Sequence, residues 1–201
     1  REVALLRGAS GSCRRGLHLP GRHDMAIWTI DADHSCAAFA IRHMALAHVR
    51  GQFTRLKGTI HFDPADKSRT AVAVEIDVAS VMTGAKKRDE HLLTADFFDQ
   101  GRYPTITFTS TSIDFLDNNR CRVNGDLTIH GTTRPVTFEG EYAGPRRNPY
   151  GDELSVGFSG AVTVNREDFG ILWGSEPMEG GGLVAGKEVQ IFLDVEADLA
   201  E

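Results

Sequence analysis

From residue 25 onward, hydrophobic and polar residues alternate in short segments along the chain. Val and Ile occupy every second position of 72–78, and Val, Ile and Leu do so in 189–195, with mostly polar or small residues between them. Successive side chains of a β-strand point to opposite faces, so this period predicts strands that are buried on one face only. The same pattern predicts further strands within 35–44, 53–63, 105–115, 122–131, 134–144 and 155–165.

Turn-forming residues separate these predicted strands. Gly, Pro, Asn and Asp are frequent in the segments 62–68, 116–120, 130–135, 144–153 and 179–182. The short spacing favours hairpins between strands that are neighbours in the sequence. About eight antiparallel strands in such a series are typical of a closed barrel or a sandwich. We therefore predict an all-β fold, and a barrel of this size has room for one small ligand or for a stack of side chains.

Two short segments are candidates for helix. Residues 86–94 contain few β-branched residues, and Leu92 and Leu93 give them an apolar side. Residues 42–49 are a second candidate, for a single short turn of helix. Both are expected to lie across an end of the barrel or in a connection between strands.

The chain of 201 residues fits one domain, which we expect to span residues 25–201. Residues 1–24 are rich in Arg and poor in residues to bury, so we expect a disordered extension or the product of an upstream start. This stretch lacks the apolar region of a secretory signal, which favours a cytoplasmic location. The sequence has no apolar run of transmembrane length. Its net charge of −6 argues against a nucleic-acid partner held by electrostatic attraction.

Candidate catalytic residues are few. Segment 81–104 places His91 beside Asp89 and Glu90, but adjacent residues of a helix do not face one another. No nucleophile motif such as G-x-S-x-G is present. The predicted function is therefore non-catalytic, with no catalytic residue assigned. An enzyme that acts on a lipid head group with His43 or His91 as its base is the alternative hypothesis.

No metal or phosphate site is predicted either. The His residues of the first third of the domain lack the i,i+4 spacing of a zinc motif, and the Gly-rich segment 179–182 lacks the Lys-Ser/Thr of a phosphate-binding loop. The Cys residues show no C-x-x-C spacing. Cys36 and Cys121 are expected to be reduced, packed thiols, and a single bond between them stays an open alternative.

The apolar composition is more informative. Eleven Phe against three Tyr indicate a dry interior, because Phe carries no hydroxyl that needs a buried partner. Two interpretations remain open from composition alone. The side chains either fill the barrel as a packed core, as in a stress-linked interaction module, or line a long cavity for a linear lipid. Burying an aliphatic chain stabilises a complex by about 0.8 kcal/mol per CH₂ group, so an apolar tube can hold a ligand without any chemistry.

A series of motifs resembles a known family. It includes "WTIDADHS", "GTIHFDP", "RDEHLLTADFFD", "VNGDLTIHGTTRPVTF" and "VNREDFGILW". From about Ile27 to Leu199 the chain is similar to the YceI-like family of polyisoprenoid-binding proteins. The family's RDxHL segment is matched by Arg88, Asp89, His91 and Leu92, its FF pair by Phe97 and Phe98, its HS and RH positions by His34–Ser35 and Arg42–His43, and its NRxDFG segment by Asn165, Arg166, Asp168, Phe169 and Gly170.

The resemblance implies a lipocalin-like antiparallel barrel, closed at one end, with one or two short helices. It implies binding, transport or storage of a polyprenyl chain, of a quinone-type or prenyl-phosphate-type lipid, or of a fatty-acid-like chain, without any other cofactor. It also implies a homodimer and no defined catalytic activity. Many members are exported behind a signal peptide, which contrasts with the cytoplasmic location expected for this chain.

The residues that contact ligand are predicted from patterning rather than from the family. The set predicted to line the apolar tail is Phe39, Met44, Phe53, Ile76, Phe98, Phe108, Phe158, Phe169, Ile171 and Trp173. The polar groups predicted at the mouth are Arg42, His43, Arg88, His91 and Asn165. A shift of strand register by one residue would exchange the inside and the outside of the barrel.

Overall fold

The computed structural model describes residues 25–117 and 119–200. The strands are β1 (Ile27–His43), β2 (Ala47–Phe53), β3 (Leu56–His61), β4 (Ala71–Asp77), β5 (Val81–Met82), β6 (Thr105–Phe115), β7 (Arg120–Ile129), β8 (Thr132–Arg147), β9 (Leu154–Asn165) and β10 (Ala185–Leu199). The helical elements are α1 (Lys86–Leu92) and the short 3-10 helices η1 (Lys67–Arg69), η2 (Val78–Ser80) and η3 (Arg166–Phe169). Residues 1–24, predicted to be an extension, lie outside the described residues.

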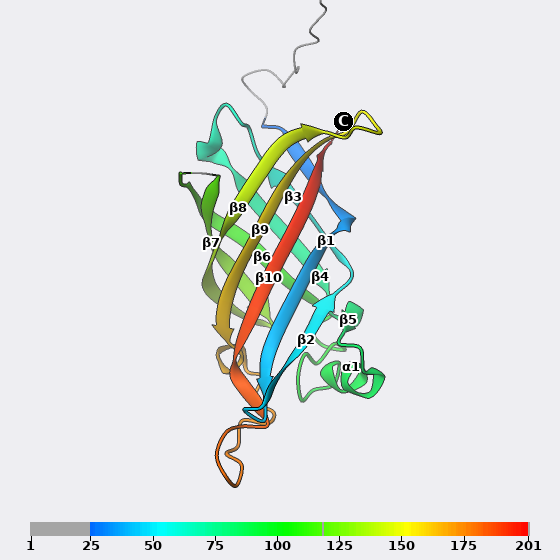
Figure 1. Cartoon of the computed structure of the whole chain (residues 1–201), viewed down its shortest axis with the longest axis vertical. Helices are drawn as coiled ribbons and strands as arrows, with labels where there is room; N and C mark the ends of the chain where they lie inside the picture. The colour runs from blue at the N-terminus through cyan, green and yellow to red at the C-terminus, as the bar shows by residue number, and fades with distance from the viewer. Residues whose placement is uncertain (1–24, 118, 201) are drawn as a thin grey trace, which may run out of the picture.

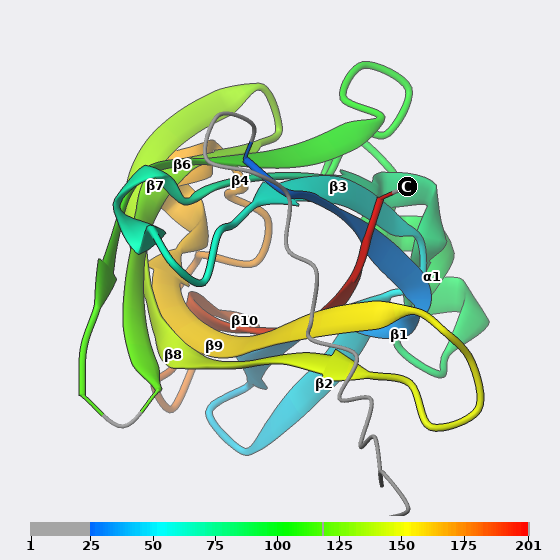
Figure 2. The same ribbon diagram turned by 90° about the horizontal axis from the view of Figure 1, so that it is seen from above.

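Eight of the strands close into an antiparallel barrel, which confirms the predicted fold class. Strands β3, β4, β6, β7, β8, β9 and β10 follow one another around the sheet, and β1 pairs with both β3 and β10. Figure 2 shows the resulting ring of strands from above. Beyond its contact with β3, the long strand β1 pairs with β2, and β5 adds to β2 at the same end of the barrel.

Strand β7 shows how alternation places side chains inside this barrel. Its buried positions are Cys121, Val123, Gly125, Leu127 and Ile129, and the residues between them are exposed or half-buried. This is the inward-facing period of two that the sequence predicted. The alternation therefore identifies which face of a strand is inside the barrel.

An aromatic cluster packs at one end of the barrel. Trp28 has no exposed surface and donates its indole N–H to the carbonyl of Phe62 at 2.9 Å. The rings of Phe62, Phe115 and Tyr142 pack together, with centroids 5.0–6.4 Å apart. We call this the far end of the barrel, and the end that carries α1 the near end (Figure 1).

The prediction of a helix within 86–94 is confirmed by α1, but the prediction of a helical turn within 42–49 is wrong. That segment is the tight hairpin between β1 and β2, in which His43 pairs with Ala47. Met44 and Ala45 have φ angles of 51° and 57°, and the Leu46 N–H donates to the His43 carbonyl at 2.9 Å. Two positive φ angles match the right-handed twist of the flanking strands, which accounts for a hairpin here.

Cys36 and Cys121 are both free thiols. Burial raises the pKa of Cys121 to about 11, so its thiol stays protonated at neutral pH. In the described part of the chain, no helix combines the length and the apolar character needed to cross a membrane.

Candidate functional site

A cavity of about 320 Å³ occupies the near end of the barrel. We call it the near cavity. Of the 29 residues that line it, 24 are apolar and none is Asp or Glu. The apolar residues are Ala37, Ala38, Phe39, Ile41, Val49, Phe53, Val74, Ile76, Leu92, Phe97, Phe98, Ile106, Phe108, Leu127, Ile129, Phe138, Val164, Phe169, Ile171, Trp173, Ala185, Val189, Ile191 and Leu193. Its volume lies at the lower end of the range of about 300–1,000 Å³ that is usual for ligand pockets.

Aromatic rings from several elements build one side of this cavity. Phe39 of β1 packs on Phe53 of β2 with ring centroids 5.9 Å apart, and Phe53 packs edge-on against Phe98 at 5.5 Å. Phe97 and Trp173 also pack together, at 5.2 Å. Trp173 lines the cavity and is nevertheless 39% exposed, so it lies where the cavity meets the surface.

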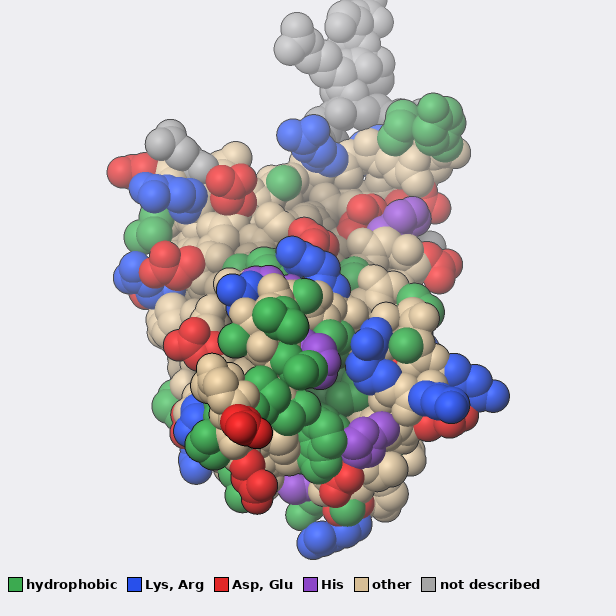
Figure 3. All heavy atoms as spheres, turned by 60° about the horizontal axis from the view of Figure 1, so that its bottom comes forward, with side chains coloured by type: hydrophobic (Ala, Val, Ile, Leu, Met, Phe, Trp, Pro, Cys, Tyr) green, Lys and Arg blue, Asp and Glu red, His purple; other side chains and the backbone are tan. Residues whose placement is uncertain are grey.

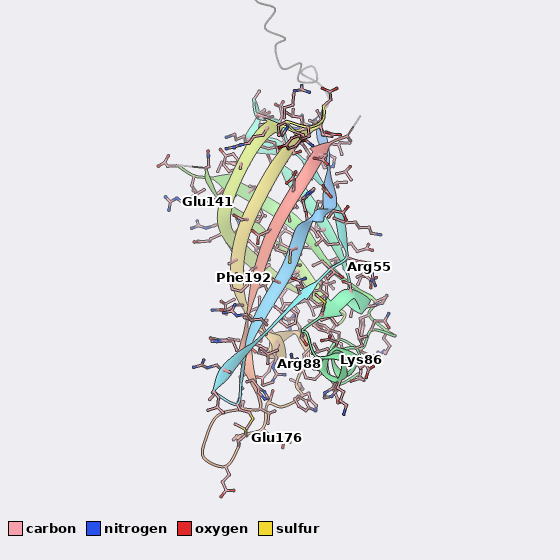
Figure 4. All side chains as sticks on the ribbon, turned by 45° about the vertical axis from the view of Figure 1, so that its right-hand side comes forward. Arg55, Lys86, Arg88, Glu141, Glu176 and Phe192 are labelled. Carbon is pink, nitrogen blue, oxygen red and sulfur yellow. The ribbon has the colours of Figure 1, made fainter. Side chains whose placement is uncertain are left out.

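Helix α1 is attached beside this opening by the charged residues of its first turn. Asp89 accepts hydrogen bonds from the backbone N–H of Thr83, at 2.8 Å, and from its hydroxyl. Arg88 donates to the hydroxyl of Thr83 at 2.7 Å and to its carbonyl at 2.9 Å. Arg88 lies on the side of α1 that faces the barrel, whereas Lys86 lies on its outer side (Figure 4). Arg88 and Asp89 thus hold the helix in place through Thr83, and Leu92, the last residue of α1, forms part of the cavity wall.

Four polar residues of the wall come from β1 and α1: Arg42, His43, Arg88 and His91. His43 donates from Nδ1 to the carbonyl of Val184 at 2.9 Å. His91 donates from Nε2 to Asp96 at 2.7 Å, and its ring lies edge-on to Trp173 at 5.0 Å. Figure 3 shows hydrophobic side chains in the middle of the face at this end of the barrel, with basic, acidic and His side chains around them.

Arg166 is a further polar residue of the wall, which the sequence prediction missed. It is only 4% exposed and donates four hydrogen bonds. Their acceptors are the carbonyls of Gly186 at 2.7 Å, Ile171 at 2.7 Å and Ala185 at 2.9 Å, and the Ser175 hydroxyl at 3.0 Å. Burial lowers the pKa of the Arg166 guanidinium from its usual value. Val164, two residues earlier in the chain, also lines the cavity. Extending the every-second-residue pattern of that strand by one step would therefore have identified Arg166.

The structure places most of the predicted site residues around the near cavity. These are Phe39, Phe53, Ile76, Phe98, Phe108, Phe169, Ile171, Trp173, Arg42, His43, Arg88 and His91. Whether they contact a ligand stays a prediction.

Three of the predicted residues, Met44, Phe158 and Asn165, do not line this cavity. Met44 is in the β1–β2 hairpin and is 41% exposed. Phe158 lines a smaller cavity of about 70 Å³ toward the far end of the barrel, which we call the far cavity. The side chain of Asn165 accepts a hydrogen bond from the Glu167 N–H at 3.0 Å and caps η3 instead of facing the cavity.

One group of side chains within 25–117 and 119–200 could offer three ligand atoms to a metal ion. Asp31, His34 and Glu196 place these atoms within 4.8 Å of one another, away from the near cavity. His34 donates from Nδ1 to Asp31 at 2.6 Å. This hydrogen bond lowers the pKa of Asp31 and raises that of His34. The short hydrogen bond accounts for the closeness of these two side chains without a metal.

Comparison with known proteins identifies the family. Residues 28–197 match the family model described as the YceI-like domain. This chain belongs to the YceI-like family. A UPF0312 protein of Vibrio cholerae is 33% identical over 157 residues, which cover 77% of this chain and 82% of the relative. A UPF0312 protein of Pseudomonas putida is 34% identical over 141 residues, which cover 70% and 73%. The resemblance inferred from the motifs is thus confirmed.

Solved structures of other proteins share the barrel. BcnA of Burkholderia cenocepacia superposes with a TM-score of 0.71 at 25% identity, over 84% of this chain and 99% of that protein. The YCEI protein of Campylobacter jejuni gives 0.67 at 29% identity, over 80% and 90%. A polyisoprenoid binding domain from Saccharophagus degradans gives 0.64 at 16% identity, over 88% and 99%, and this likeness concerns the fold alone.

Proposed function

We propose that this YceI-like protein binds a long apolar lipid, such as a polyisoprenoid, a prenyl quinone or a fatty-acid-like chain. The near cavity supports this proposal, because its wall is almost entirely apolar and it opens beside Trp173 and α1. A chain that enters it leaves water, and each buried CH₂ group contributes about 0.8 kcal/mol. The structural neighbour from Saccharophagus degradans is described as a polyisoprenoid binding domain, which supports the ligand class.

The polar head of this lipid is proposed to lie among the guanidinium groups of the cavity wall. Arg42 and Arg88 line the cavity, and within 25–117 and 119–200 neither forms an ion pair with a carboxylate. Arg166 also lines the cavity, but four of its N–H groups already donate to protein acceptors. Guanidinium groups only donate hydrogen bonds, so they favour a head that accepts them. A carboxylate, a phosphate or a quinone carbonyl meets this requirement. The proposed role is binding and needs no chemical step.

The test begins with organic extraction of the purified protein and mass spectrometry of the extract. The delipidated protein is then titrated with a prenyl quinone while tryptophan fluorescence is followed. The chain has two Trp residues, and Trp173 lies at the cavity whereas Trp28 is buried at the far end. Quenching is expected in the wild-type protein and is expected to be lost in W173F.

A matched pair of variants on β10 tests the location. Val189 lines the near cavity, whereas the next residue, Gln190, is exposed and does not line it. V189W is expected to fill the cavity and abolish extraction of lipid and uptake of quinone, while Q190W is expected to retain both. An extract free of lipid together with no quinone uptake by the wild-type protein would contradict the proposed function.

A further inference from the structure

A layer of side chains divides the interior of the barrel into two compartments. The near and far cavities share four lining residues, Val74, Phe108, Phe138 and Leu193, which come from β4, β6, β8 and β10 respectively. On either side of this layer, the residues of a strand line one cavity only. On β6, for example, Ile106 lines the near cavity and Ile113 lines the far cavity.

Two phenylalanine rings form the centre of this layer. Phe108 and Phe138 are 6% and 2% exposed, and their rings meet edge to face with centroids 5.4 Å apart and an interplanar angle of 86°. Strand β7 lies between β6 and β8 and has Gly125 at an inward position. A Cβ atom on Gly125 would lie 2.4 Å from Cζ of Phe108. The Phe108 ring therefore occupies the space that a side chain at position 125 would fill.

The space beyond these rings is also suited to an apolar chain. The far cavity is lined by Val123, Val156 and Phe158 among other apolar side chains, and no charged residue lines it. A chain that extended past Phe108 and Phe138 would therefore continue to be buried. At about 70 Å³, the far cavity has room only for the last carbon atoms of a chain.

We propose that Phe108 and Phe138 set the longest chain that the protein binds with full affinity, because they separate the near cavity from the far cavity. This inference rests on the proposed function. Each methylene that enters the near cavity raises affinity about fourfold, the equivalent of about 0.8 kcal/mol. Methylenes beyond the length that reaches the two rings stay outside or fold back, so affinity reaches a plateau with chain length.

The experiment measures the dissociation constants of a series of saturated fatty acids of increasing length for the delipidated full chain. The wild-type protein is expected to show the plateau. F108A and F138A are expected to extend the fourfold steps by two or more methylenes and to bind the longest acids at least tenfold more tightly than the wild-type protein does. F108L and F138L remove the rings with a smaller loss of core volume, so they give the answer if the Ala variants do not fold.

Two further Phe-to-Ala variants serve as controls for the general effect of removing a phenylalanine ring elsewhere in the barrel. F158A enlarges the far cavity but leaves the layer between the two cavities intact, since Phe158 lines only the far cavity. F192A changes a residue of β10 that lines neither cavity and lies on the barrel in Figure 4. Both are expected to keep the wild-type plateau.

The outcomes are distinguishable. Wild-type affinity that rises without a plateau, an unmoved plateau in the Phe108 and Phe138 variants, or an equal shift in F158A would overturn this inference while leaving lipid binding intact. Failure of the wild-type protein to bind any acid or quinone would instead overturn the proposed function, and the inference with it.

Discussion

Replacing Arg166 with Met is expected to lower the free energy of unfolding by about 3 kcal/mol. The guanidinium donates to three backbone carbonyls and one hydroxyl, all within 2.7–3.0 Å, in a site that is 4% exposed. Met has a similar length but no donor, so the three carbonyls lose their Arg166 hydrogen bonds. A buried polar group that loses its partner costs about 1–3 kcal/mol, and the smaller value applies where the adjacent cavity admits water.

The loss of these hydrogen bonds is partly offset by the removal of a buried charge. Burying a guanidinium removes its hydration and costs several kcal/mol, and this cost is absent in R166M because Met is uncharged. Neighbouring hydrogen bonds are moreover not additive. A net loss of about 3 kcal/mol corresponds to a fall in Tm of roughly 6–12 °C for a domain of this size.

The assay is urea denaturation followed by circular dichroism, with R122M as the matched control. Arg122 pairs with Glu139 at 2.9 Å on the exposed face of the barrel, where an ion pair contributes less than about 1 kcal/mol. If R166M loses no more stability than R122M, the four hydrogen bonds do not stabilise the fold and the reasoning fails. R166M is also expected to weaken quinone binding, because Arg166 connects η3 and the start of β10 to the segment 171–175 that carries Trp173.

Three further predictions concern groups away from the near cavity. W28F removes the indole N–H that donates to the Phe62 carbonyl, and urea denaturation is expected to show a loss of about 1–3 kcal/mol. Cys121, with its pKa raised to about 11, is expected to react with a thiol reagent only on unfolding, as peptide mapping by mass spectrometry would show. NMR titration is expected to give His34 a pKa above 6.5, and D31N should lower it.

The pairing of His34 with Asp31 makes the stability of the folded state depend on pH. Because the interaction with Asp31 raises the pKa of His34, its contribution to stability is present below the unfolded pKa of about 6.5 and is lost as pH rises through the raised value. A His34 pKa that is equal in the wild-type protein and D31N would refute the pairing. Labelling of Cys121 in the folded protein would refute its burial, and W28F with wild-type stability would refute the role of its N–H.

The fold could be predicted from the sequence because a barrel of hairpins repeats one simple pattern. Each strand of the barrel needs an apolar residue at every second position, and short turns connect most strands to their sequence neighbours. The hairpin at 42–49 was missed because its turn positions hold Met44 and Ala45. Both are good helix formers, whereas Asn or Gly is usual at such positions. Pairing of β1 with β2 overrode that local preference.

The candidate site could be predicted less well. The alternation along a strand shows which residues face the interior, but not how deep in the barrel they lie. Phe108 and Phe158 both belong to inward-facing patterns, yet Phe108 lines both cavities and Phe158 lines only the far one. Their depth depends on the tilt and the stagger of strands, which the alternation of residues does not contain. Asn165 was predicted at the mouth, but its side chain caps η3, and the adjacent Arg166 lines the cavity instead.

Whether such a barrel is hollow depends on how the volume of its inward side chains is distributed. Trp28, Phe62 and Tyr142 occupy the far end, where only about 70 Å³ is left. At the near end, Ala37 and Ala185 contribute little volume to the wall, and the interior retains about 320 Å³. Phe residues occur at both ends, so a count of aromatic residues cannot distinguish a packed interior from a cavity. Small residues also line both cavities, Ala37 and Ala185 the near one and Ala143 and Gly157 the far one, so the distinction depends on how the side chains pack in three dimensions.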